Sequence, residues 1–338
     1  GFNESSDKLD LTILLTRITF PFLLFISLAS FFSAILNSHN KFGIAAATPI
    51  VLNIILIFIL FFLKYENDIL VIYLAYGVSF AGIVQLIILF NVVKKYFLPK
   101  LKLDFKITKK VKIFFNKLIP SIFSSGVTQI NILVGTIIAS FQANAVSYLY
   151  YADRIYQINL AIAGIAVGTV SLPVLSKAFK AKNFSKVSMI QNKSIQLSLL
   201  LSMPASLGLI IASEEIVNGL FGYGSFNFND VQMTSKALMF FGYGIIAFAL
   251  VKILSNFFFA RDNTKTPFFI SAFIVFLNVL ISLTFFRSIG FLIIPIATSI
   301  STWVGVLIFL YQLKKNNFLL IQNELFYNTF KIVISSLI

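Results

Sequence analysis

Apolar residues in this chain fall into long blocks that are separated by short polar connections. The blocks are about 20 residues long, which is the length of helix that crosses the hydrocarbon core of a bilayer. Only 12% of the residues are charged and 58% are hydrophobic, whereas about a quarter of the residues of a soluble domain are charged. The pattern therefore predicts an all-α, polytopic transmembrane helical bundle and excludes a soluble globular domain.

Ten apolar segments are expected, with boundaries that are uncertain by a few residues. The segments are 11–36, 44–63, 69–93, 113–141, 145–176, 194–213, 233–258, 267–286, 290–313 and a last one that begins near 321. We expect further helices on both sides, because the chain begins at Gly1 and not at Met, and because it ends inside an apolar run.

Basic residues are concentrated in alternate connections. Most of the 27 lysines and arginines lie near 41, 94–117, 177–193, 261–265 and 314–315. The N-terminal tail and the remaining connections hold most of the 12 acidic residues. Because basic loops stay on the cytoplasmic side of a membrane, the first set is predicted to be cytoplasmic and residue 1 to lie outside. The net charge of +15 thus reflects membrane orientation, and we predict no nucleic-acid partner.

Two parts of the chain resemble each other as a weak internal repeat. Phe32, a polar loop and Asn53 are spaced like Phe257, a second polar loop and Asn278. The two copies have the same predicted orientation. Parallel repeats of this kind suggest two helical bundles with a site between them.

Ionisable residues inside the apolar segments are candidates for function, because each costs about 2.5–3.5 kcal/mol at the centre of a membrane helix. The candidates are Arg17, Asp153, Arg154, Lys236, Lys252 and Lys331. Snorkelling to the membrane surface is the favoured interpretation for Arg17 and Lys252. Asp153 and Arg154 are the strongest signal, since they lie in an otherwise apolar helix.

The predicted helix around Arg154 has a polar face. Ser147, Tyr151 and Arg154 lie on one side of this helix, and Gln157 lies beside them. An arginine presents a planar fork of donors that matches phosphate oxygens. We therefore predict that Arg154 binds a phosphate or pyrophosphate and that Asp153 orients it. A structural ion pair between helices and a snorkelling arginine remain open alternatives.

Two amides lie in the middle of the predicted segment 113–141. Gln129 and Asn131 either face a cavity or form hydrogen bonds across helices. We include Gln129 among the predicted substrate contacts.

Signals for catalysis are poor. The chain has no cysteine and one histidine, His39, which falls in a predicted loop. It has no phosphate-binding loop of the Walker A type. We predict a protein that is not an enzyme and that has no cofactor and no metal site.

Several short stretches resemble one known family over almost the whole chain. They are ITFPFLL at 18–24, AILNS at 34–38, TPIVLN at 48–53, YYADR at 150–154, VGTVSLP at 167–173, LFGYGSF at 220–226, and RD and KTP within 261–267. Their order and spacing are similar to those of the MurJ (MviN) family of lipid II flippases, within the wider group of multidrug, oligosaccharide-lipid and polysaccharide exporters.

The resemblance implies a two-lobed transporter fold of fourteen helices, of which about ten are present. Residues 1–93 would be the second half of the N-terminal lobe, and 94–112 a basic cytoplasmic linker between the lobes. Residues 113–313 would form the C-terminal six-helix lobe. Residues 314–338 would be a linker and the start of the final helix pair.

The resemblance also implies a function in the bacterial cytoplasmic (inner) membrane. The family flips lipid II, the undecaprenyl-pyrophosphate-linked peptidoglycan precursor, to the outer leaflet by alternating access. Arg154 matches a cavity arginine of the family, whereas Gln157 stands where some members have an acid. Other cell-wall synthesis proteins are implied as partners. Alternatives are an exporter of another polyprenyl-linked oligosaccharide or of a small molecule, and a membrane scaffold that transports nothing.

Overall fold

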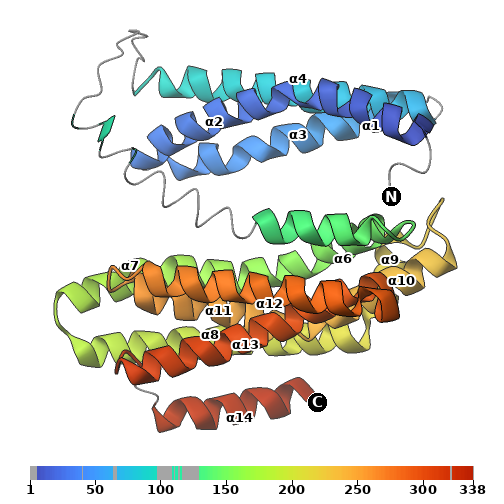
Figure 1. Ribbon diagram of the computed structural model, residues 1–338. Coiled ribbons are helices and arrows are strands. Elements are labelled where there is room, and N and C mark those ends of the chain that lie inside the picture. Colours follow the sequence, from blue (N-terminus) through green and yellow to red (C-terminus); the bar gives the residue numbers. More distant parts are fainter. Residues whose placement is uncertain are drawn as a thin grey trace. The chain divides into compact units, whose positions relative to one another are not determined.

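A computed structural model of the chain describes residues 6–39, 41–63, 67–96, 129–319 and 322–337, together with the isolated residues 109, 111, 112 and 115. Within these ranges the structure is helical and has no strand, which confirms the all-α prediction. The chain divides into two compact units, Gly1–Ile107 (unit 1) and Thr108–Ile338 (unit 2). Figure 1 shows the helices of each unit.

Unit 1 contains four helices in chain order. They are α1 (Ser6–Thr19), α2 (Pro21–Ser38), α3 (Phe42–Phe62) and α4 (Asn67–Val93). α4 packs against both α2 and α3. The buried contact between α2 and α4 is apolar, and its centre is Leu36 against Leu89 and Val93. The break between α1 and α2 coincides with Pro21, which has no N–H to continue the helical hydrogen bonds.

Unit 2 contains the remaining helices. After an apolar helix at Gln129–Ala139 come α6 (Ala145–Leu160), the π-helix η2 (Ala161–Ala166), α7 (Val167–Lys180), α8 (Phe184–Ile211), α9 (Ser213–Phe221), α10 (Phe228–Gly242), α11 (Ile245–Phe259), α12 (Lys265–Ile289), the short η3 (Gly290–Leu292), α13 (Ile293–Lys315) and α14 (Asn323–Leu337). Each of the ten predicted segments has a helical counterpart, although the first part of segment 113–141 lies outside the described residues.

The structure adds three details to the predicted segments. The segment at 233–258 is two helices, because α10 and α11 meet at a 41° bend next to Gly242 and Gly244. α8 begins at Phe184, ahead of the predicted residue 194, because the Asn183 side chain caps it by accepting from the Lys186 N–H at 3.0 Å. α9 occupies part of a predicted connection and is too short to cross a membrane.

The helices are long and apolar enough for a multi-pass membrane protein. Six described stretches pass this test, and the bent pair α10–α11 makes a seventh if it forms one span. One stretch, Lys265–Lys315, has 51 residues, which would be about 77 Å of straight helix against a hydrocarbon core of about 30 Å. It contains α12 and α13, which pack against each other. The chain turns back between them at Gly290, whose φ of 75° suits a glycine.

Unit 2 has two separate apolar cores. The first core includes Leu175, Leu199, Ile253, Phe257 and Phe309. The second core includes Ile155, Leu209, Phe241, Phe291 and Ile294. α8 and α13 each take part in both cores. Each of these helices contributes to the first core near one of its own ends and to the second core near its opposite end. Between these contributions both helices carry buried serines: Ser202 and Ser206 on α8, and Ser299 and Ser301 on α13.

Arg261 anchors the connection between α13 and α14. Its guanidinium donates to the backbone oxygens of Phe257 at 2.6 Å and Phe318 at 2.8 Å. It also lies over the rings of Phe179, at 5.1 Å, and Phe318, at 4.5 Å. Gln191 of α8 donates to the same Phe318 oxygen at 2.9 Å. Burial lowers the pKa of the Arg261 guanidinium, but an arginine stays protonated in proteins.

Asn256 joins α11 to α7 next to the π-helix. Its side-chain amide is buried and donates to the Gly168 carbonyl oxygen at 2.8 Å. A Cβ atom on Gly168 would approach this amide to 3.0 Å. The close approach of the two helices therefore depends on glycine at that position.

We predict that Asn256→Ala destabilises unit 2. Hydrogen bonds between membrane helices contribute roughly 1 kcal/mol each, and the free energy of unfolding should fall by about that amount. Unfolding of the purified protein in detergent, followed by circular dichroism, measures the change. Asn316→Ala is the matched control, because the exposed Asn316 amide donates only to Gln312 of its own helix. Equal losses for the two variants would contradict the prediction.

We also predict that Arg261→Lys loosens the anchor of α14. A lysine keeps the charge but not the fork that donates to two carbonyl oxygens. Because a hydrogen bond from a charged group contributes about 1.5–3 kcal/mol, trypsin should cut after Lys314 and Lys315 about tenfold faster. Arg287→Lys, at an exposed arginine in the last turn of α12, should leave the cutting rate unchanged. An unchanged rate in Arg261→Lys would refute this role.

Candidate substrate-binding site

All the predicted site residues except Gln129 lie on α6, whose opposite face is buried. Ala145, Tyr148, Ala152 and Ile155 form the buried face. The Tyr148 hydroxyl donates to the Asp230 carboxylate of α10 at 2.9 Å, and its ring lies 5.7 Å from that of Phe291. α6 is therefore held by one face, which leaves the other face available for a ligand.

Arg154 projects from the exposed face of α6. Its guanidinium lies 4.5 Å from the centre of the Tyr150 ring, a cation–π contact that fixes the side chain against its own helix. No carboxylate among the described residues lies within ion-pair distance of Arg154. The interhelical ion pair that we left open is thus not formed within the described part of the chain.

Asp153 is hydrogen-bonded to polar groups of its own helix. The carboxylate accepts a hydrogen bond from the Gln157 side-chain amide, and the Tyr156 hydroxyl is a further hydrogen-bonding neighbour. Tyr156 stacks on Phe241 of α10, with ring centres 4.5 Å apart. Asp153 therefore links Gln157, which is exposed, to the buried contact between α6 and α10.

Tyr151 belongs to an aromatic cluster. Its ring lies 4.8 Å from Phe221, at the end of α9, and 5.3 Å from Phe226. It is half-buried, whereas Ser147, one turn earlier on α6, is exposed. Of the predicted contacts on α6, Ser147, Arg154 and Gln157 are open to a ligand, and Tyr151 presents only part of its ring.

Gln129 lies apart from this group within the described contacts. It is exposed and stands at the first described residue of its helix, and among the described residues it makes no hydrogen bond with α6. Asn131, two residues later, accepts a hydrogen bond from Asn278 of α12 at 2.8 Å. The second amide of the pair therefore forms the bond across helices that the sequence left open.

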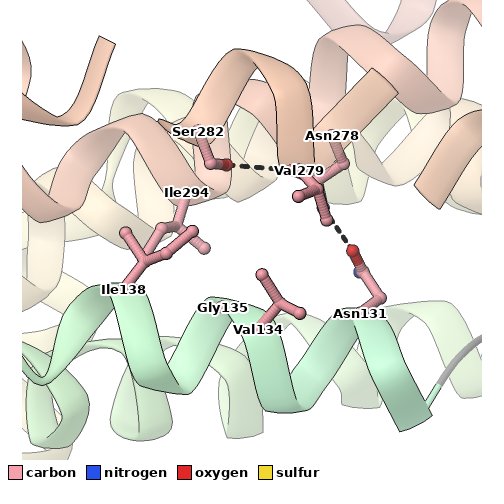
Figure 2. A pocket seen from close by; sticks show the side chains of 8 residues that line it. All are labelled: Asn131, Val134, Gly135, Ile138, Asn278, Val279, Ser282 and Ile294. Carbon is pink, nitrogen blue, oxygen red and sulfur yellow. Dashed lines mark hydrogen bonds between the residues drawn. The ribbon is translucent and has the colours of Figure 1, made fainter. Parts of the chain in front are cut away.

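Figure 2 shows a small pocket beside Asn131, with a volume of about 10 Å³. It is lined by Asn131, Val134, Gly135, Ile138, Asn278, Val279, Ser282 and Ile294. The Asn278 amide also donates to Thr298 at 3.2 Å, and Ser282 donates to Asn278 at 3.3 Å. The lining carries no charged side chain, so this pocket offers no positive group to bind a pyrophosphate.

Asn278 and Ser282 were not predicted as site residues. Asn278 appeared in the sequence only as one end of the internal repeat, and Ser282 gave no signal. A polar residue that recurs four positions later on an apolar helix lies on the same face, and this spacing could have identified the pair.

Comparisons with known proteins address the whole chain. The model of the family described as "Lipid II flippase MurJ" matches residues 1–338. A "Probable lipid II flippase MurJ" of Rickettsia prowazekii is 37% identical over 318 residues, which are 94% of this chain and 62% of the relative. One of Rhizobium tropici is 35% identical over 99% of this chain and 64% of its own length. The chain thus spans less than two thirds of the length of these relatives.

Solved structures give the same result. A structure of "Lipid II flippase MurJ, inward closed conformation" matches with a TM-score of 0.82 and 28% identity, over 98% of this chain and 68% of that one. An inward-facing multidrug transporter of the MATE family matches with a TM-score of 0.75 at 14% identity, which shows a common fold alone. From the family match over all of its residues, the chain belongs to the MurJ family of lipid II flippases.

Proposed function

We propose that the protein containing this chain flips lipid II from the cytoplasmic to the outer leaflet of the bacterial inner membrane by alternating access. Membership of the MurJ family supports this substrate. The single observation that carries the proposal is Arg154, a membrane-helix arginine that is exposed and has no carboxylate partner among the described residues. The movement breaks and forms no covalent bond, so we propose a transporter and not an enzyme.

The chemistry of Arg154 fits a pyrophosphate. An unpaired arginine inside a membrane segment costs about 2.5–3.5 kcal/mol on insertion scales, and an anionic ligand offsets that cost. The guanidinium can bind two phosphate oxygens side by side through paired N–H donors. The guanidinium also carries the positive charge that an anion needs. An arginine that merely snorkels would tolerate replacement by alanine.

We assign supporting roles to the neighbours of Arg154. Ser147 and Gln157 offer exposed hydrogen-bonding groups on the same helix, and Tyr151 offers part of an aromatic face. Asp153 acts by holding the Gln157 amide rather than by touching the anion. Gln129 remains a proposed contact from a different helix.

The proposed division of the chain follows the family. Residues 1–93 would complete the N-terminal lobe, 94–112 would link the lobes, 113–313 would form the C-terminal lobe, and 314–338 would begin the final helix pair. Lipid II is the proposed ligand, and other cell-wall synthesis proteins are proposed partners.

Complementation tests the substrate and the site together. The protein containing this chain would be expressed in cells depleted of their own lipid II flippase. We expect the wild type to restore growth and Arg154→Ala to lose it. A charged hydrogen bond contributes about 1.5–3 kcal/mol, so the loss of lipid II binding should be roughly 10- to 100-fold. Arg154→Lys should restore growth in part, because a lysine keeps the charge without the fork.

Arg287→Ala serves as the matched control, since Arg287 is also an exposed arginine of a membrane helix in unit 2. It should grow like the wild type. If the well-expressed wild type fails to restore growth, the lipid II assignment is wrong, and another exporter of the same group takes its place. If Arg154→Ala restores growth as well as the wild type does, Arg154 is not the binding residue.

A further inference from the structure

The bend between α10 and α11 is held by side chains from two other helices. It lies at Gly242–Tyr243–Gly244, where the helical hydrogen bonds are interrupted. The carbonyl oxygens at the bend accept from Ser299 Oγ (to Phe240, 2.7 Å), Ser206 Oγ (to Gly242, 2.8 Å) and Trp303 Nε1 (to Tyr243, 2.9 Å). We call Ser206, Ser299 and Trp303 the clamp. In a bilayer, carbonyl groups freed by a bend need such donors.

The glycines at the bend leave room for the clamp. A Cβ atom on Gly244 would lie 2.6 Å from the Ser299 hydroxyl oxygen and 2.5 Å from the end of the Phe248 ring. A Cβ atom on Gly242 would lie 3.1 Å from Ile210 of α8. Any side chain at residue 244 would therefore push against the clamp.

A second break lies at the same level of unit 2. The π-helix η2 separates α6 from α7, and π-helical turns recur at functional sites. Gly164 in η2 packs so closely on α11 that a Cβ atom would lie 3.0 Å from the Ala249 Cα. Ala249 is one turn beyond the bend. The π-helix thus packs against the start of α11, just beyond the bend.

α6 and α10 lie on the same side of these breaks and pack together. Tyr148 bonds to Asp230 near one end of the pair, and Tyr156 stacks on Phe241 near the breaks. By contrast, α8, α12 and α13 run past this level as continuous helices. We call α6 and α10 the arm, and α8, α12 and α13 the frame.

Unit 1 contains a helix break at the corresponding place. α1 and α2 meet at Phe20–Pro21, and Ser79 of α4 donates to the Ile18 carbonyl oxygen beside this break. Tyr243 follows Ile18 by the same number of residues that separates Phe257 from Phe32. Trp303 falls one position from the counterpart of Ser79. Both copies of the repeat therefore carry a helix break whose carbonyl oxygens accept a hydrogen bond from a later helix.

We propose that the arm pivots against the frame at the two breaks, and that Ser206, Ser299 and Trp303 are positioning residues that hold the pivot in this state. Arg154 lies on the arm, so its position changes with the pivot. The proposed pivot is independent of the identity of the substrate. Only its consequence for ligand binding by Arg154 rests on the proposed function.

Distances between spin labels test the proposal in the protein containing this chain, reconstituted in lipid nanodiscs without substrate. The chain contributes no cysteine of its own, so labels are placed at introduced cysteines. Exposed positions supply an arm–frame pair (Phe228 and Arg287), an arm–arm pair (Val146 and Phe228) and a frame–frame pair (Lys193 and Arg287). Full straightening of the 41° bend would move the far end of α10 by about 15 Å.

Release of the clamp should affect one distance alone. In Ser299→Ala/Trp303→Phe we expect the arm–frame distribution to broaden or to gain a second peak, with the arm–arm and frame–frame distributions unchanged. Ser301→Ala is the matched control, because the buried Ser301 hydroxyl bonds only to Thr298 of its own helix. It should leave all three distributions unchanged.

Two outcomes would overturn the pivot. One is an arm–frame distribution that stays as narrow as in the wild type, and the other is equal broadening of all three pairs, which indicates general loosening. If the double variant does not fold, Gly244→Ala replaces it, since the added methyl group pushes on Ser299 and the same two outcomes apply. Growth in the complementation experiment plays no part in this test, so failure of the proposed substrate would leave its result intact.

Discussion

The need to pair every backbone carbonyl oxygen away from water governs this structure. An unbroken helix meets that need by itself, and at two irregular places in unit 2 specific side chains meet it. Asn256 serves the Gly168 oxygen next to the π-helix, and Ser206, Ser299 and Trp303 serve the bend of α10–α11. Several buried polar residues of unit 2 thus lie where the backbone is irregular and supply the donors that it needs there.

The positions of the helices could be predicted from the sequence because hydrophobicity and charge act locally. Apolar length predicted the segments, and the order of the YYADR and VGTVSLP stretches resembled the family that the comparisons confirmed. The bend at Gly242–Gly244 could not be predicted in the same way. Two glycines in an apolar run are common, and a bend there depends on donors such as Trp303 that come from a helix far along the chain.

Only some features of the candidate site could be predicted from the sequence. Arg154 stood out because a charge in an apolar helix is costly, and helical periodicity placed it beside Ser147. The role of Asp153 could not be predicted from the sequence. Its carboxylate is hydrogen-bonded to Gln157 and Tyr156, and Tyr156 is held by Phe241 of another helix. The Asn131–Asn278 bond joins residues far apart in the chain, and periodicity carries no information on such pairs.

The two apolar cores of unit 2 determine how the protein tolerates substitutions. Each core is packed within itself, and cooperative opening follows such packing. Loss of a large side chain such as Phe309 would first melt the half around Arg261 and leave the half that carries Arg154 folded. Unit 2 in this sense consists of two modules. Substitutions can accumulate in one module without an immediate loss of stability in the other.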